Sequence, residues 1–172
     1  MIGLMWVLEL VDQLLLRQWL NGLGIRPRSI SGLWGILFAP FLHGGLAHLV
    51  ANTVPFLILG WLVLVRRTSD FFIVTVVVML LGGLGVWLLA PGNTVHIGAS
   101  GLIFGYIGYL LLRGYFERGI VSIAIAVAVA FFYGGALWGV LPNQPGISWQ
   151  GHLFGFLSGG VAAKMLSDTA GR

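Results

Sequence analysis

The sequence predicts an all-α integral membrane protein, built as a bundle of six transmembrane helices in a single domain over residues 1–172. Two observations carry this prediction: 58% of the residues are hydrophobic and only 8% are charged, and the apolar residues stand in long uninterrupted runs. Soluble domains carry about 25% charged residues, so a surface this poor in charge would not stay dispersed in water. Long apolar runs are typical of membrane spans rather than of a soluble core.

Six apolar runs are candidates for spans, since a helix needs roughly 20 residues at about 1.5 Å each to cross a bilayer. They cover about residues 4–20, 44–65, 70–90, 99–113, 119–140 and 149–167. The first run is interrupted by Glu9, Asp12 and Arg17 and lacks a small-residue cleavage site, so we interpret it as a span rather than a removable signal. The sequence leaves open whether Glu9 and Asp12 have a further function.

The basic residues indicate an orientation rather than a nucleic-acid partner. They are scattered, mostly at the ends of apolar runs, so the net charge of +4 forms no basic stripe. If six spans alternate, Arg17, Arg26 and Arg28 fall on one side of the membrane. The larger set on the other side is Arg66, Arg67, Arg113, Arg118, Lys164 and Arg172. The positive-inside rule then places both termini in the cytoplasm, and the compact chain favours a bacterial plasma membrane, with a eukaryotic organelle left open.

Polar residues inside predicted spans are candidates for function, because they are costly at membrane depth. His48 and Asn52 lie early in the second span, Ser100 opens the fourth and His152 opens the sixth. These three spans run in the same direction, so all four side chains are expected on the extracytoplasmic side, a little below the membrane surface. Chance placement would spread them over both leaflets.

The chemistry of these residues points to acyl transfer. A serine hydroxyl needs a base, and histidine is the usual base near neutral pH. His48 and Asn52 share a helix face and both donate hydrogen bonds, as does the free backbone N–H of Ser100 at a helix start, so the three are candidates for an oxyanion hole. No predicted neighbour of His152 is acidic, which favours a Ser-His dyad over a triad. Interhelical hydrogen bonding by His48 and Asn52 remains an alternative.

Glycines in the same spans would let the fourth and sixth helices approach closely. Gly101 and Gly105 share one face of the fourth span, and Gly155 and Gly159 share one face of the sixth. Small residues at this spacing bring helix backbones together. On the glycine spacing alone, ordinary helix packing without catalysis is the favoured explanation.

At these residues the sequence resembles the rhomboid family of intramembrane serine proteases. The matching motifs are Gly98-Ala99-Ser100-Gly101, His43-x4-His48-x3-Asn52 and Gly151-His152-x2-Gly155-x3-Gly159, each in the span where the family has it. The resemblance covers about residues 25–165, and three motifs in order are far more specific than Gly-x-Ser-Gly alone.

The resemblance implies a rhomboid-like fold with Ser100 as nucleophile and His152 as general base. It implies that His48, Asn52 and the Ser100 amide form the oxyanion hole. The flanking Gly98 and Gly101 would support it.

The resemblance also implies that the ring of Phe104 packs against the catalytic histidine; many relatives have tyrosine there, so a role for the hydroxyl is lost. His43 would lie at the mouth of the second span, either supporting the serine region or as a simple interfacial histidine. His96 is expected to be a solvated loop residue. The loop from Leu141 to Gln150, with Pro142, Pro145 and Trp149, resembles the family's movable cap, although an interfacial anchor explains Trp149 as well.

Two departures from the family pattern concern the rest of the chain. The first connection, around Arg26, Arg28 and Trp34, lacks the Trp-Arg pair of many members, which puts loop-dependent positioning in question. We also expect no cytosolic domain before the first span.

The function predicted from the sequence is an intramembrane serine endopeptidase that cuts membrane-protein substrates, which we expect to enter from the lipid bilayer by spans two and five. The alternative within the family is an inactive rhomboid-like protein that binds transmembrane helices. A transporter would need an inverted repeat or broken helices at mid-membrane, and a metalloenzyme would need carboxylates beside the histidines; the sequence has neither, and it has no cysteine. We therefore predict no metal and no cofactor, and leave substrate identity and oligomeric state open.

Overall fold

The computed structural model describes residues 1–142 and 146–170, and across these residues the chain is helical. The one extended pairing in the described part is an isolated bridge between Ile25 and His96. Pro145 of the expected cap loop and Arg172 of the charge argument lie outside the described residues.

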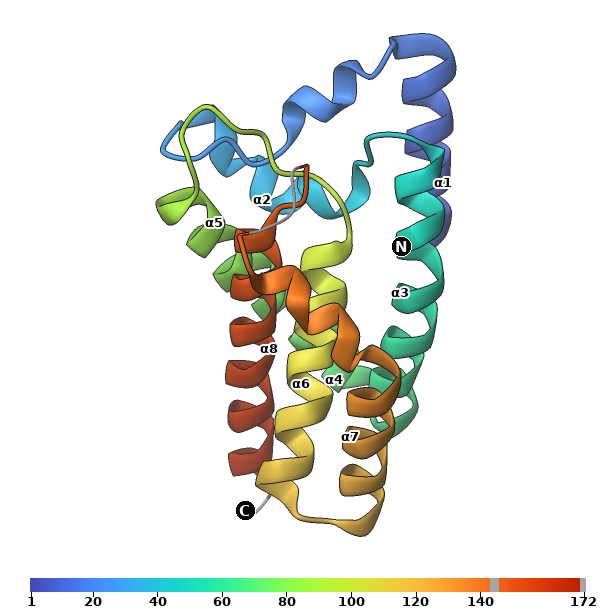
Figure 1. The fold of residues 1–172 in the computed structure, drawn as a ribbon, viewed down its shortest axis with the longest axis vertical. Helices are drawn as coiled ribbons and strands as arrows, with labels where there is room; N and C mark the ends of the chain where they lie inside the picture. Colours follow the sequence, from blue (N-terminus) through green and yellow to red (C-terminus); the bar gives the residue numbers. More distant parts are fainter. Residues whose placement is uncertain (143–145, 171–172) are drawn as a thin grey trace.

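The helices are joined into a bundle with irregular structure concentrated at one end (Figure 1). Their bounds are α1 Ile2–Val11, α2 Gly35–Phe38, α3 Leu46–Arg66, α4 Thr68–Val77, α5 Gly83–Leu89, α6 Ser100–Glu117, α7 Ile120–Tyr133 and α8 Trp149–Ala170. Short π-helical segments extend α1 over Asp12–Leu16 and join α4 to α5 over Val78–Gly82. 3-10 helices cover Trp19–Leu23, Ser31–Leu33, Ala39–Phe41 and Gly134–Val140.

Three of the helical stretches are long and apolar enough to cross a membrane. They are Leu46–Arg66, Thr68–Leu89 and Ile120–Val140, and they agree with three of the runs predicted from the sequence to within two residues. The helices α6 and α8 begin within one residue of the predicted spans but continue further, to Glu117 and Ala170. The count of six spans stays a prediction.

The predicted first span, residues 4–20, is wrong at its C-terminal end. The helix stops at Leu16, and Arg17 and Gln18 turn into the left-handed region with φ of 52° and 65°. Asp12 is the physical cause: its carbonyl accepts the Gln18 N–H at 3.0 Å and its carboxylate accepts the Leu20 N–H at 2.9 Å. These bonds satisfy backbone groups that a continuing helix would have used.

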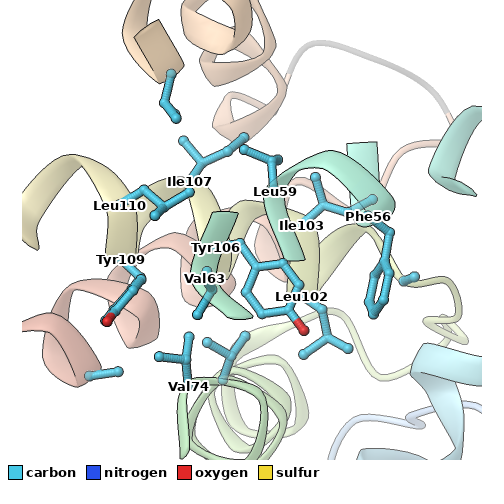
Figure 2. Packing of buried hydrophobic residues seen from close by; sticks show 14 of the residues in the cluster. Phe56, Leu59, Val63, Val74, Leu102, Ile103, Tyr106, Ile107, Tyr109 and Leu110 are labelled. Atoms are coloured by element: carbon cyan, nitrogen blue, oxygen red, sulfur yellow. The ribbon is translucent and has the colours of Figure 1, made fainter. Parts of the chain in front are cut away.

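Helix α6 is the centre of the bundle, in contact with α3, α4, α7 and α8. Every residue from Leu102 to Leu110 is buried. Figure 2 shows side chains from α3 (Phe56, Leu59) and α4 (Val74) meeting those of α6 around the ring of Tyr106. The Tyr106 hydroxyl lies 2.8 Å from the Thr75 hydroxyl, so its polar atom is satisfied inside the apolar core. A helix enclosed in this way can be less apolar than one that faces lipid.

The end of the bundle opposite the irregular loops is closed by an ion-pair network. Arg113 bonds Asp70 at 2.5 Å and Glu117 at 2.6 Å, and Arg66 bonds Glu117 at 2.7 Å. Ser122 donates to Glu117 at 2.5 Å. Residues of α3, α4, α6 and α7 are thereby joined, so these charges are paired with one another rather than left exposed to an apolar surrounding.

The long first connection is anchored by Arg28 and Trp87, which no motif had indicated. The Arg28 guanidinium donates to the carbonyls of Leu88 and Ala90 at 3.0 and 2.8 Å, which caps the C-terminus of α5. The Trp87 indole donates to the Ser29 carbonyl at 2.8 Å. These bonds fix the connection in place of the Trp-Arg pair that the sequence lacks.

Candidate active site

The four polar residues singled out in the sequence come from helix starts at one end of the bundle. His48 lies in the first turn of α3, Ser100 begins α6 and His152 lies in the first turn of α8. All three helices begin at the upper end in Figure 1, where the first connection also runs. The parallel arrangement argued from alternating spans is therefore present in the fold.

Close packing of α6 against α8 brings together the glycines that adjoin Ser100 and His152. A Cβ atom on Gly155 would lie 2.2 Å from the Gly101 carbonyl oxygen, and one on Gly159 would lie 1.9 Å from that of Gly105. No side chain fits at either position, so the two backbones touch. A Cβ atom on Gly101 would lie 3.5 Å from the Gly151 carbonyl oxygen. Gly101 directly follows Ser100 in the chain, and Gly151 directly precedes His152.

The His152 ring is held on two sides. Its Nδ1 lies 2.9 Å from the Gly139 carbonyl oxygen, which only accepts, so Nδ1 carries the proton and Nε2 is left with a free lone pair. The Phe104 ring stacks on it at 4.0 Å between centroids and 7° between planes, the contact that the family resemblance implied. A Cβ on Gly139 would lie 3.1 Å from Nδ1 and 3.2 Å from the Phe104 Cζ, so a larger residue there would press on both rings.

Ser100 is half-buried and lines a cavity of about 60 Å³. The cavity is walled by small residues of α6 and α8, among them Gly101, Gly151 and Gly155, and by apolar side chains of the first connection. As the first residue of α6, Ser100 has a backbone N–H with no partner among the described residues. Within the same described part its hydroxyl forms no hydrogen bond to His152.

His48 and Asn52 both reach Gly98, two residues before Ser100. Gly98 has φ +110°, and a Cβ there would lie 3.0 Å from His48 Nε2 and 4.0 Å from Asn52 Nδ2. His48 Nδ1 accepts the Gly44 N–H at 3.4 Å, so Nε2 is the protonated nitrogen. Asn52 Nδ2 donates one hydrogen to the His48 carbonyl at 3.0 Å and keeps the other. Two donors therefore converge beside the segment that leads into Ser100.

His43 is fully buried and bonded to that same segment. Its Nε2 accepts the Ala99 N–H at 3.4 Å, and its ring meets the edge of His48 at 5.2 Å. Burial, with a smaller contribution from the nearby His48, lowers the pKa of His43 to about 4, although a bond to the Phe41 backbone opposes the shift. A neutral ring is the form that accepts from Ala99, so His43 supports the serine segment rather than acting as an interfacial histidine.

Two residues of this region were missed by sequence reasoning, His96 and Ser148. His96 was expected to be solvated, but it is only 8% exposed. Its Nδ1 lies 2.6 Å from the Ser148 hydroxyl, which also accepts the Gly151 N–H at 3.1 Å and so caps α8. A serine three residues before Gly151, at the start of an apolar helix, is a capping signal that the sequence does carry.

The loop predicted to cover the site is only partly described. Trp149, predicted to lie in that loop, is the half-buried first residue of α8. The described segment that does touch the site is the 3-10 helix Gly134–Val140, through Gly139. No group of His, Asp or Glu suited to hold a metal occurs among the residues that the structure describes.

Comparisons with known proteins show similarity to proteins that carry a rhomboid domain. A family model described as Rhomboid domain matches residues 31–169. An uncharacterized protein of Mycobacterium tuberculosis is 47% identical, over 96% of this chain and 72% of its own length. A Bacillus subtilis protein named as a candidate rhomboid protease is 28% identical over 75% of this chain and 65% of its own. RHOMBOID-like protein 4 of Arabidopsis thaliana is 29% identical over 73% of this chain and 32% of its own.

Proposed function

The chain belongs to the rhomboid family of membrane proteins, and from that premise we propose that it is a serine endopeptidase that cuts membrane-protein substrates within or near their transmembrane segments. Ser100 is the nucleophile and His152 the general base. The observation that carries the proposal is the His152 ring, stacked on Phe104 and bonded through Nδ1 to the Gly139 carbonyl. This arrangement leaves Nε2 as a base on the helix packed against the start of α6.

The reaction follows the usual two steps of acyl transfer. The Ser100 Oγ attacks the scissile carbonyl carbon while its proton passes to His152 Nε2. The C–N bond then breaks, and the same proton leaves with the amine product. Water attacks the acyl-enzyme with His152 again taking a proton, which returns to Ser100 Oγ as the acid product departs. No step needs a metal or a cofactor.

Negative charge on the carbonyl oxygen is stabilised by three donors. These are the protonated Nε2 of His48, the unused amide hydrogen of Asn52 and the backbone N–H of Ser100. The support for this assignment is their common position around Gly98, where a side chain would collide with the His48 ring. The dipole of α6 adds positive potential at its N-terminus.

The topology that suits this chemistry is six spans in one domain over residues 1–172, with both termini in the cytoplasm. The site then lies just below the extracytoplasmic face of a bacterial plasma membrane, and substrates enter from the lipid between α3 and α7. Arg66, Arg113 and their acidic partners lie at the end of the bundle opposite the site, which fits the cytoplasmic side.

A serine-directed fluorophosphonate probe tests the dyad directly. We expect covalent labelling of the purified wild type, no labelling of Ser100→Ala and a strong loss in His152→Ala, with the same order for cleavage of a single-span test substrate. Labelling of Ser100→Ala at the wild-type level would remove Ser100 from the mechanism. A metal chelator is expected to leave the cleavage rate unchanged.

The second candidate is an inactive rhomboid-like protein that binds transmembrane helices. One observation favours it: among the bonds of the described residues, none joins the Ser100 hydroxyl to the His152 ring. Catalytic hydrogen bonds are often long in the absence of substrate and shorten on binding, so the missing bond does not by itself decide between the two candidates. An experiment with substrate distinguishes them. Substrate binding without any probe labelling or cleavage would select the inactive protein.

A further inference from the structure

His96 joins three segments that are far apart in the sequence. Its backbone pairs with Ile25 of the first connection through two hydrogen bonds of 3.0 Å. Its ring bonds Ser148, immediately before α8, and Thr94 in its own loop, at 2.6 and 2.8 Å. His96 stands four residues before Ser100, and Ser148 stands four residues before His152. The two residues therefore link the segment that enters α6 to the first turn of α8.

The direction of each hydrogen bond is determined by groups that only donate or only accept. The Pro91 carbonyl accepts from the Thr94 hydroxyl at 2.6 Å, so the Thr94 oxygen accepts from His96 Nε2–H. His96 Nδ1 is then the acceptor, and it receives the Ser148 hydroxyl hydrogen. The Ser148 oxygen in turn accepts the Gly151 N–H at 3.1 Å. Burial lowers the pKa of His96, which favours the neutral ring that this arrangement needs.

The His96–Ser148 bond lies at the same level of the α6–α8 contact as Ser100 and His152. The tightest glycine contacts between α6 and α8, at Gly155 and Gly159, lie below the two reacting residues, and beside Ser100 and His152 the glycines Gly101 and Gly151 are only in ordinary contact. At this level the His96–Ser148 bond is the polar link between the segment entering α6 and the start of α8. Both residues line the same cavity as Ser100.

We infer that the His96–Ser148 hydrogen bond holds the first turn of α8 against the segment leading into Ser100, and that His96 and Ser148 are thereby positioning residues for the dyad. They touch neither substrate nor the reacting atoms; they act through the placement of His152. The catalytic half of this inference rests on the proposed function, whereas the structural half does not.

The test compares His96→Phe, Ser148→Ala and the double variant with the wild type. His96→Phe keeps a planar ring and leaves the Ser148 cap on Gly151, and Ser148→Ala removes both the link and the cap. Ser148→Thr retains the hydroxyl, and Ser31→Ala removes a serine that is exposed and bonded to Ser29. Hydrogen exchange is measured on the peptide covering the start of α8, together with kcat and KM for a test substrate.

We expect His96→Phe and Ser148→Ala each to speed exchange at the start of α8 and to lower kcat by roughly 10-fold to 100-fold, with KM within about 2-fold. Because both residues act through one bond, the double variant should lose little more than the worse single variant. Ser148→Thr should retain most of the rate and Ser31→Ala all of it. A role in overall folding alone would lower the amount of folded protein without this split between kcat and KM.

The exchange measurement separates this inference from the proposed function. If the wild type neither labels nor cleaves, the protease proposal fails, and faster exchange in both single variants still supports the link. Unchanged exchange in His96→Phe, or fully additive losses in the double variant, would overturn the inference whether or not the protein is a protease.

Discussion

The two ends of the bundle use polar residues in opposite ways. At the ion-paired end, Arg113 bonds both Asp70 and Glu117, and each of these carboxylates accepts a further hydrogen bond, from Tyr109 and from Ser122 respectively. At the site end, each imidazole of His48 and His152 is bonded at Nδ1 and has no hydrogen-bond partner at Nε2 among the described residues. Paired charges in a low-dielectric surrounding hold helices together, whereas a ring fixed through one nitrogen offers the other for chemistry. The difference predicts that one end governs stability and the other activity.

The largest effect expected is on activity, from His152→Ala. Loss of the general base should lower cleavage and probe labelling by about 10⁴-fold or more, because the hydroxyl is a weak nucleophile alone. Ser158→Ala on the same helix, where the hydroxyl bonds only the Phe154 carbonyl, should retain activity. The rates are measured in single-turnover labelling with equal amounts of folded protein.

The next effect belongs to the other end, and it is on stability. Arg113→Met leaves the Asp70 carboxylate, 3% exposed, without its cation, and breaking such a buried pair costs about 3–5 kcal/mol. Arg118→Met removes an exposed charge just beyond the end of the same helix and should change stability by less than about 0.5 kcal/mol. Thermal unfolding in detergent measures both. If Arg113→Met instead reduced probe labelling of Ser100 per folded molecule, the assignment of stability to one end of the bundle and activity to the other would be wrong.

A smaller effect on activity is expected from Asn52→Ala. Removing one oxyanion-hole donor lowers kcat by about 10²-fold to 10³-fold while leaving KM nearly unchanged. Thr53→Ala is the matched control on α3, since Thr53 bonds the Leu49 carbonyl and accepts the Trp6 indole N–H away from the site. Equal kcat in Asn52→Ala and wild type would leave His48 and the Ser100 amide as the only donors.

The smallest effect is a pH dependence of stability at the site end. The pKa of His43 is about 4 in the folded protein against about 6.5 when unfolded, so the unfolded chain binds the proton first as the pH falls. Stability is therefore full above pH 6.5 and declines between pH 6.5 and 4, by up to about 1.4 kcal/mol for each pH unit. The unfolding temperature of His43→Gln should decline less over this interval than that of the wild type. Parallel curves for the two proteins would show that another group causes the decline.

Motif spacing and span direction selected, without coordinates, residues that the structure brings to one end of the bundle. Three predicted helix starts, carrying His48, Ser100 and His152, lie at one end of the fold as expected. The contact of Phe104 with His152 followed from the family resemblance and not from any period in the sequence. The end of the first helix was misjudged because the run to Leu20 is apolar, whereas Asp12 ends the helix through bonds that hydropathy does not register.

His96 and Ser148 were missed for a related reason. A histidine in a loop between two spans is solvated unless another segment covers it, and the covering partner lies 52 positions away in the sequence. The Ser148 capping signal was visible in the sequence, but its second partner was not. Local patterns identify helix caps, whereas bonds between distant loops depend on where those loops meet.

The sequence by itself determined that the chain is membrane-embedded, that its helices are apolar on the outside, and that serine, histidine and amide donors stand at the starts of parallel helices. Composition and spacing are enough for this, because lipid forces backbone hydrogen bonds inside each helix. Only the tertiary structure decided which nitrogen of His152 is free, how Gly139 and Phe104 hold its ring, and how Arg113 closes the far end. Those features depend on contacts between residues distant in sequence, whose distances and directions no local pattern contains.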